Sequence, residues 1–155
     1  MTTSDSPWLT ADQQDVWRRW LRVTSLLPVA LHDQLQGDSD LSFPDFEVLT
    51  DLSEAEGHRL RVGELARSLQ WERSRVSHHV RRMETRGLVR REDCADDARG
   101  AFVALTPGGL DAVERAAPGH ARTVRRLMFE PLAARELGQL SRILARIENA
   151  LATDV

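Results

Sequence analysis

Apolar residues near the start of the chain recur with the 3.6-residue period of an amphipathic helix. The sequence Thr10-Ala-Asp-Gln13 fits a capping box at the beginning of this pattern. It predicts a first helix over residues 10–36, after a disordered tail at 1–9. Pro28 lies inside this helix. Because proline removes a backbone donor and crowds the preceding turn, we expect a kink or a break just before it.

Two further helical patterns occupy the end of the chain. Thr106 and Pro107 predict the start of one helix, which we expect Pro118 and Gly119 to interrupt. The last pattern opens at Pro131, and its apolar residues fall on one stripe. Such a stripe cannot be buried within so small a domain. It therefore favours a homodimer over the alternative, an intramolecular bundle with the first helix.

Three shorter helices and a β-hairpin are predicted between these ends. The helices are expected at 45–53, 62–69 and 73–86. Gly87 follows the third helix, where a left-handed residue is favoured. β-Branched and aromatic residues at 88–92 and 101–106 flank a turn-rich segment and predict two strands. A short turn between the last two helices, followed by a hairpin, is the order of a winged helix-turn-helix, whose third helix enters the DNA major groove.

The predicted fold class is therefore mainly α with a small β-hairpin: a winged helix-turn-helix with N- and C-terminal dimerisation helices. Residues 10–36 and 107–155 are expected to form the helical dimerisation region, and residues 41–106 the DNA-binding lobe. A length of 155 residues suits one domain with appended helices.

Positive charge is concentrated in one part of the chain. Residues 57–91 hold ten arginines against three acids, whereas the whole chain has a net charge of −3. Because charges beyond about 10 Å are screened at physiological salt, attraction to phosphate depends on the field at the contact face. The basic block therefore favours double-stranded DNA as a partner. RNA is disfavoured, because the basic face lacks an aromatic stacking platform.

The predicted helix at 73–86 has one apolar face and one polar face. At 100° per residue, Val76, Val80 and Met83 share a side and are expected to pack inward. The polar face carries cations, hydroxyls and an imidazole, which suit base edges and phosphates. The residues expected to bind DNA are Arg73, Ser74, Arg75, Ser77, His78, Arg81 and Arg82. A solvated helix face is the alternative, but such a face usually mixes acids with bases along its length.

The predicted hairpin tip carries Arg99 beside Asp97. We expect Arg99 to bind DNA by entering the adjacent minor groove, where narrow A·T-rich DNA deepens the negative potential. A turn arginine paired with Asp97 is the alternative. Both can hold, because an aspartate can orient an arginine before DNA is bound.

Five runs of sequence, taken in order, resemble the MarR (multiple antibiotic resistance regulator) family of transcription factors. They are residues 41–55 (LSFPDFEVLTDLSEA), 61–66 (RVGELA), 77–91 (SHHVRRMETRGLVRR), 97–100 (DARG) and 103–106 (VALT). The resemblance covers essentially residues 10–152, and the joint order is specific where each run alone is weak. It implies a homodimer built from the first, fifth and sixth helices, recognition helices at 73–86, wings at 88–106 and a palindromic promoter site.

The resemblance also implies a mode of regulation. Many relatives repress, and release DNA when a small phenolic or other lipophilic ligand enters the cleft between the dimerisation helices and the DNA-binding lobe. Others respond to oxidation of a cysteine. This chain departs from the family pattern in two ways: Pro28 lies within the first helix, and tyrosine is absent, so that a phenol pocket must use Trp, His, Arg or Ser.

Candidate effector residues lie in the first helix and in the wing. Trp17 and Trp20 are expected to bind a small aromatic or anionic effector, with Arg22 or Arg18 as the partner of an anion. Such a tryptophan pair is more often part of an interface or a core, and that interpretation stays open. Cys94, in the predicted wing, is the candidate redox residue, although nearby aspartates disfavour a reactive thiolate.

Composition and motifs narrow the remaining classes. A single cysteine, a polar start and the lack of an apolar window of about 18–20 residues predict a cytoplasmic protein with no signal peptide and no membrane partner. No HExxH, CxxC, phosphate-cradling glycine loop or Gly-x-Ser-x-Gly elbow is present, so no enzyme activity, catalytic residue, metal ion or cofactor is expected.

The sequence therefore predicts a homodimeric, sequence-specific DNA-binding transcriptional regulator, a repressor released by a small ligand. Two alternatives remain: a cysteine redox sensor on the same fold, and a winged-helix protein-interaction module without DNA binding.

Overall fold

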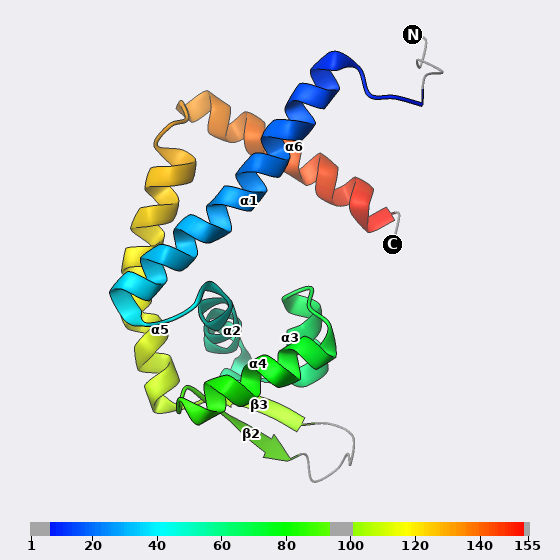
Figure 1. Cartoon of the computed structure of the whole chain (residues 1–155). Coiled ribbons are helices and arrows are strands. Elements are labelled where there is room, and N and C mark those ends of the chain that lie inside the picture. The colour runs from blue at the N-terminus through cyan, green and yellow to red at the C-terminus, as the bar shows by residue number, and fades with distance from the viewer. Residues whose placement is uncertain (1–6, 94–100, 154–155) are drawn as a thin grey trace.

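The computed structural model describes residues 7–93 and 101–153, in which six α-helices accompany one small sheet. The helices are α1 (Ala11–Ser39), α2 (Phe43–Glu54), α3 (Val62–Ser68), α4 (Arg73–Thr85), α5 (Pro107–Val124) and α6 (Ala134–Thr153). The strands are β1 (Arg59–Arg61), β2 (Val89–Asp93) and β3 (Ala101–Leu105). Figure 1 shows α2, α3, α4 and the sheet gathered at one end, while α1, α5 and α6 extend away from them. We call these two parts the winged lobe and the terminal helices.

The first helix begins where the sequence predicts but does not break at its proline. Thr10 Oγ1 accepts a hydrogen bond from the Gln13 backbone N–H at 3.3 Å, and Gln13 Oε1 accepts one from the Thr10 N–H at 2.9 Å. α1 then runs on through Pro28, so of the kink or break expected there, the break is wrong. Leu31 and Leu35, which follow the proline, are buried, and this packing offsets the backbone hydrogen bond that proline removes.

The fifth helix also continues through a proline. α5 contains Pro118 in its interior, so the predicted interruption there is wrong. Val113 and Ala116 are buried in the same cluster as the core of the winged lobe, and that packing holds the helix together on the N-terminal side of the proline. The irregularity comes later, as a π-helical turn at Arg125–Phe129.

The predicted boundaries within the winged lobe hold to within two residues. Ser42 and Asp45 form a capping box at the start of α2, as each side chain accepts a hydrogen bond from the other residue's backbone N–H. Gly87 follows α4 with a φ of +72°, the left-handed value that the sequence predicts. By contrast, α1 extends beyond the predicted end at residue 36, and Asp40 is its left-handed cap with a φ of 56°.

The sheet has one strand more than the predicted hairpin. β2 and β3 form that hairpin, with Arg91 opposite Val103 in an antiparallel register. β1, which the sequence did not predict, pairs antiparallel with the other edge of β3 and gives the strand order β1-β3-β2. The three residues of β1, Arg-Leu-Arg, contain a single apolar position and therefore carry no periodic signal.

The core of the winged lobe confirms the inward face predicted for α4. Val76, Val80 and Met83 are all buried, in one cluster that includes Leu49 of α2 and Leu65 of α3. Because these three anchors lie on one side of α4, the opposite side is held toward solvent.

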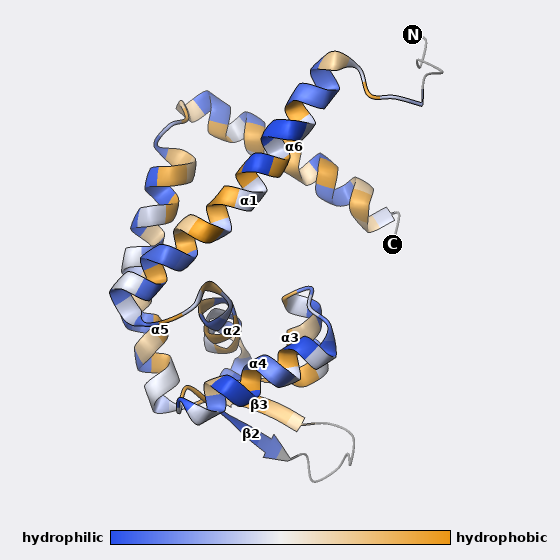
Figure 2. Cartoon of the chain, in the orientation of Figure 1, coloured by the Kyte–Doolittle hydropathy of each residue, from blue (hydrophilic) through white to orange (hydrophobic). Residues whose placement is uncertain are grey.

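The terminal helices expose apolar residues that the described part of the chain leaves uncovered. α6 buries none of its residues, which argues against an intramolecular bundle. Figure 2 shows hydrophobic positions along both α1 and α6. The large exposed ones are Val16, Trp17, Trp20, Leu21, Val23, Leu26 and Val29 of α1 and Leu137, Ile143, Ile147 and Leu151 of α6. Among the described helices, none combines the length and the hydropathy needed to cross a bilayer.

Candidate DNA-binding surface and adjoining pocket

α4 is held at the surface by closed turns at both ends. The turn from α3 is closed by a hydrogen bond from the Trp71 N–H to the Ala66 carbonyl, at 2.9 Å. At the other end the Leu88 N–H donates to the Met83 carbonyl at 3.1 Å, and Gly87 supplies the positive φ that this closure requires. Both ends of α4 are therefore fixed while its polar side faces outward.

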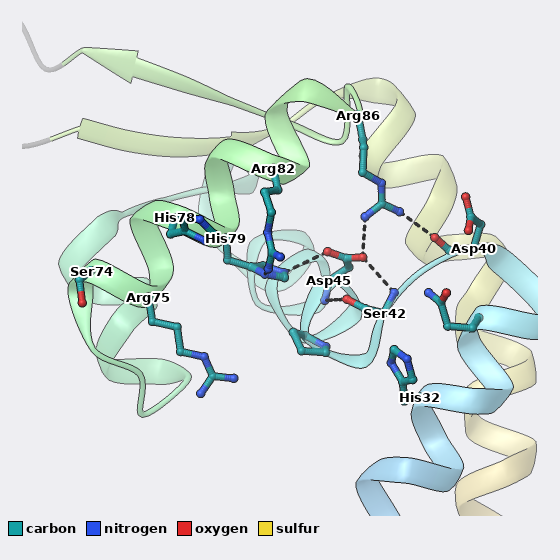
Figure 3. A pocket seen from close by; sticks show the side chains of 12 residues that line it. His32, Asp40, Ser42, Asp45, Ser74, Arg75, His78, His79, Arg82 and Arg86 are labelled. Atoms are coloured by element: carbon teal, nitrogen blue, oxygen red, sulfur yellow. Dashed lines mark hydrogen bonds and ion pairs between the residues drawn. The ribbon is translucent and has the colours of Figure 1, made fainter.

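The α4 residues expected to bind DNA are accessible. Ser77 is half-buried, and the other six are exposed: Arg73, Ser74, Arg75, His78, Arg81 and Arg82. Figure 3 shows that the set is not uniform, because Arg82 reaches from α4 toward the start of α2. Whether each of these side chains contacts DNA stays a prediction.

Arginines of the basic block differ in their partners. Arg86 pairs with Asp45 at 2.7 Å, while Arg59 and Arg90 share Glu92 at 3.3 Å and 2.7 Å. In the described part of the chain, no arginine within α4 itself pairs with a carboxylate. The α4 arginines therefore form no direct ion pair within the described chain, although Glu47 interacts electrostatically with Arg75, whereas part of the charge on the rest of the block is paired directly.

An aromatic ring holds the guanidinium of Arg75. Its central carbon lies 4.0 Å from the centroid of the Trp71 ring, and Trp71 in turn meets the ring of His79 edge-on at 5.5 Å. A guanidinium that stacks through its face keeps its N–H edge open for an oxyanion. Trp71, at the turn before α4, therefore restrains an arginine of the candidate surface.

His79 is a residue of this region that the sequence analysis missed. It is buried, with Nε2 3.0 Å from Asp45 Oδ1, and its Nδ1 accepts a hydrogen bond from Arg82 Nη2 at 2.8 Å. Because a guanidinium can only donate, Nδ1 is the acceptor in this contact, and Nε2 is the ring atom that faces Asp45. The helical angle places His79 beside Met83 on the inward side, and this was the signal that could have identified it.

Asp45 collects several donors at the start of α2. It is 3% exposed, and it accepts from the Arg86 guanidinium at 2.7 Å and from the Ser42 N–H at 2.9 Å. Burial alone raises the pKa of the Asp45 carboxyl, but the contacts with His79, Arg86 and Ser42 outweigh it and hold the pKa far below its ordinary value. Asp45 is therefore a buried carboxylate that stays charged at neutral pH.

An open pocket of about 870 Å³ adjoins this cluster, between the end of α1, the start of α2 and α4 (Figure 3). Nearly all of its lining is polar or charged. The lining residues are His32, Gln36, Asp40, Ser42, Pro44, Asp45, Ser74, Arg75, His78, His79, Arg82 and Arg86. Four of the residues expected to bind DNA therefore also face this pocket.

The other predicted site residues lie elsewhere. Trp17, Trp20 and Arg22 are exposed on α1 and are not among the residues that line the pocket, so their role as effector ligands stays a prediction. Arg99 and Cys94 fall outside the described residues. Within the described ranges, no group of three or more His, Cys, Asp or Glu side chains is placed to hold a metal ion.

Comparison with known proteins gives the same family from sequence and from fold. The MarR family model matches residues 39–100. AbsC, a MarR family transcriptional regulator from Streptomyces coelicolor, is 40% identical, with 96% of this chain and 99% of AbsC covered and a TM-score of 0.88. Sco3205, a MarR family regulator from the same organism that was crystallised in complex with DNA, is also 40% identical, with 94% of this chain and 92% of Sco3205 covered and a TM-score of 0.89.

A curated relative matches over a shorter stretch. The HTH-type transcriptional regulator PrsX of Escherichia coli is 33% identical over 70 residues, which are 45% of this chain, and the match spans only 42% of the length of PrsX. The two Streptomyces proteins, by contrast, align over nearly their whole length on the same fold. The chain therefore belongs to the MarR family of transcriptional regulators.

Proposed function

We propose that this regulator is a repressor that binds a palindromic promoter site as a homodimer, with α4 of each protomer in the major groove. The observation that carries this proposal is the asymmetry of α4. Three apolar anchors fix its inner side in the core, while its outer side presents arginines that form no direct ion pair with a carboxylate in the described chain. A helix of this kind, closed at both ends, suits base edges and phosphates.

The dimer supplies the second recognition helix. The apolar stripe of α6 and the exposed apolar residues of α1 need a covering surface, and a second copy of the chain supplies it by two-fold symmetry. A two-fold dimer matches a palindrome whose half-sites lie about 34–36 Å apart, one turn of DNA. The crystallisation of Sco3205 with DNA, at 40% identity, supports the same use of this fold here.

We further propose that a small anion, rather than a lipophilic phenol, enters the polar pocket and releases the DNA. Among the described residues that line the pocket, all except Pro44 have a polar or charged side chain, and Arg75 stacks its guanidinium face on Trp71, which leaves its N–H edge open. A carboxylate or phosphate oxyanion matches this edge. The DNA is released if the anion binds more tightly to a state of the dimer in which the separation of the recognition helices does not match the DNA.

The test compares two duplexes, one from the promoter region upstream of the protein's own gene and one with the same bases shuffled. We expect the upstream duplex to bind about 10³-fold more tightly at physiological salt. Equal affinity for both would contradict sequence-specific regulation at this site. No DNA binding at all would favour the protein-interaction alternative.

The ligand arm of the test adds benzoate or inorganic phosphate to the bound upstream duplex, with chloride at matched ionic strength as the control. We expect either anion to weaken binding more than chloride does, and the Arg75→Gln variant to lose most of that difference. A larger effect of uncharged phenol would show that the pocket prefers an apolar ligand.

A further inference from the structure

Arg86 belongs to the basic block by sequence but is engaged inside the protein. Its Nη1 donates to Asp45 Oδ2 and its Nη2 donates to the Asp40 carbonyl, both at 2.7 Å. Asp40 is the C-terminal cap of α1, Asp45 lies in the first turn of α2, and Arg86 caps α4. One guanidinium therefore joins the end of α4 to the end of α1 and to the start of α2 (Figure 3).

The Asp45 carboxylate is also in contact with His79, which lies in the middle of α4. His79 Nε2 lies 3.0 Å from Asp45 Oδ1, so Asp45 is joined to α4 at two points separated by two turns of helix. The main packing partners of α4 are α3 and β2, both within the winged lobe. Arg86 is thus a direct polar link from α4 to α1.

We propose that Arg86 and Asp45 are positioning residues that fix α4 relative to α1, and thereby set the separation of the two recognition helices in the dimer. This inference rests on the proposed dimer and adds to it a residue-level origin for half-site spacing. Arg86 acts through Asp45 and Asp40 and does not contact DNA.

The geometry explains why an arginine occupies this position. A planar guanidinium can serve two acceptors at once with little freedom left, whereas a lysine ammonium on a flexible stem acts as a point charge. Asp45 is buried and also held by its capping contact with Ser42, so the acceptor cannot follow Arg86 if α4 shifts. A base pair inserted between the half-sites increases their separation by about 3.4 Å and rotates one relative to the other by about a tenth of a turn. A rigid link makes the dimer sensitive to both changes.

The first test measures the separation of the two winged lobes. Ser68→Cys is labelled with a nitroxide in a Cys94→Ser background, because Ser68 is exposed at the end of α3 and outside the candidate surface. Pulsed electron–electron double resonance should give one narrow distance distribution, and Arg86→Met should broaden it at least two-fold. The matched control is Arg90→Met, an arginine of similar exposure that pairs with Glu92 within the sheet, which should leave the width unchanged.

The outcomes of the distance measurement separate the two proposals. A narrow distribution that Arg86→Met does not alter overturns the positioning role while leaving the dimer intact. No measurable pair of labels at micromolar protein means that the chain is a monomer, which overturns the proposed dimer and this inference with it.

The second test uses a duplex selected by the unmodified protein from a random library, then lengthened by one base pair between its half-sites. We expect the insertion to weaken wild-type binding at least 10-fold and Arg86→Met binding less than 3-fold, with an unchanged salt slope. Arg86→Lys should fall between them, and Asp45→Asn should resemble Arg86→Met.

Two results would overturn the positioning role in this second test. One is a salt slope that falls by about 0.9 in Arg86→Met, the signature of a lost phosphate contact. The other is a lowered melting temperature with the spacing profile of the wild type, which would leave Arg86 as a stabilising residue only. Arg86→Lys keeps the charge and decides the question if Arg86→Met does not fold.

Discussion

The winged lobe and the terminal helices solve the burial of apolar residues in different ways. The lobe has a closed core, in which Leu49, Leu65 and Val103 are fully buried and to which the end of α1 and the first half of α5 also contribute. α6 buries nothing within the chain, and α1 buries only Leu31 and Leu35 near its end. The comparison teaches that one chain buries the apolar residues of the part proposed to read DNA, whereas α1 and α6 leave an apolar surface that the proposed dimer would cover.

The largest expected effect is on the free energy of unfolding. It distinguishes stability that comes from the core of the lobe from stability that comes from association of two chains. Leu49→Ala should lower the free energy of unfolding by about 3 kcal/mol, because it leaves a cavity in a closed core. The loss should be the same at every protein concentration in urea. Ile143→Ala, on α6, should act only through association, so that its effect grows as the protein is diluted. Equal and concentration-independent losses would contradict the comparison.

A charge on the α6 stripe should break the dimer without unfolding the lobe. Ile143→Asp places a carboxylate on a residue that is 53% exposed in the single chain and buried in the proposed interface. We expect a monomer in sedimentation at micromolar protein and a loss of roughly 100-fold or more in affinity for the upstream duplex. Asn149→Asp adds the same charge to α6 off the stripe and is the control. A dimer that survives Ile143→Asp would show that the interface lies elsewhere.

Acid should weaken the link between the two regions. The folded state holds the pKa of Asp45 well below its ordinary value of 3.8, so this carboxylate contributes stability above that value. This contribution decreases as the pH falls below about 4, because Asp45 is protonated in the unfolded chain at a higher pH than in the folded chain. Unfolding by urea should therefore show a steeper acid loss in the wild type than in Asp45→Asn. Parallel pH profiles for the two proteins would contradict the buried ion pair.

A smaller pH effect is expected where α5 meets α2. The ring of His120 lies 4.4 Å from that of Phe46, and burial lowers the pKa of His120 below its ordinary value of 6.5. A depressed histidine pKa means that the folded state favours the neutral ring, so stability is full above pH 6.5 and falls as the pH drops below it. His120→Gln should flatten that part of the profile between pH 7 and 5. If the stability of His120→Gln depends on pH as steeply as that of the wild type, another group is responsible for the effect.

Sequence patterns predicted what depends on local chemistry. The capping residues of α1, the inward anchors of α4 and the glycine after α4 are each determined within a few neighbouring residues. The break expected at Pro28 and the interruption expected at Pro118 are wrong because they ignored packing beyond the neighbouring residues. Pro28 and Pro118 lie in helices whose residues pack against other elements, and that tertiary contact outweighs a local preference of about 3 kcal/mol.

The parts of the site that the sequence did not reveal depend on long-range pairs. Asp45 meets His79 and Arg86 across the chain, and nothing near any of the three signals the contact. Counting charge along residues 57–91 also treated Arg86 and Arg90 as available for phosphate, although each has a carboxylate partner. Charge density in a sequence therefore predicts a DNA-binding region but not which individual arginines are free of carboxylate partners.

The most direct test of the central claim is the slope of log affinity against log salt for the upstream duplex. If the α4 arginines neutralise phosphates, Arg81→Ala and Arg82→Ala should each reduce the slope by about 0.9 relative to the wild type. Arg90→Ala, whose side chain is 54% exposed but paired with Glu92, should leave it unchanged. Slopes that fall with Arg90→Ala and stay fixed with both α4 variants would contradict the assignment of α4 as the surface that binds DNA.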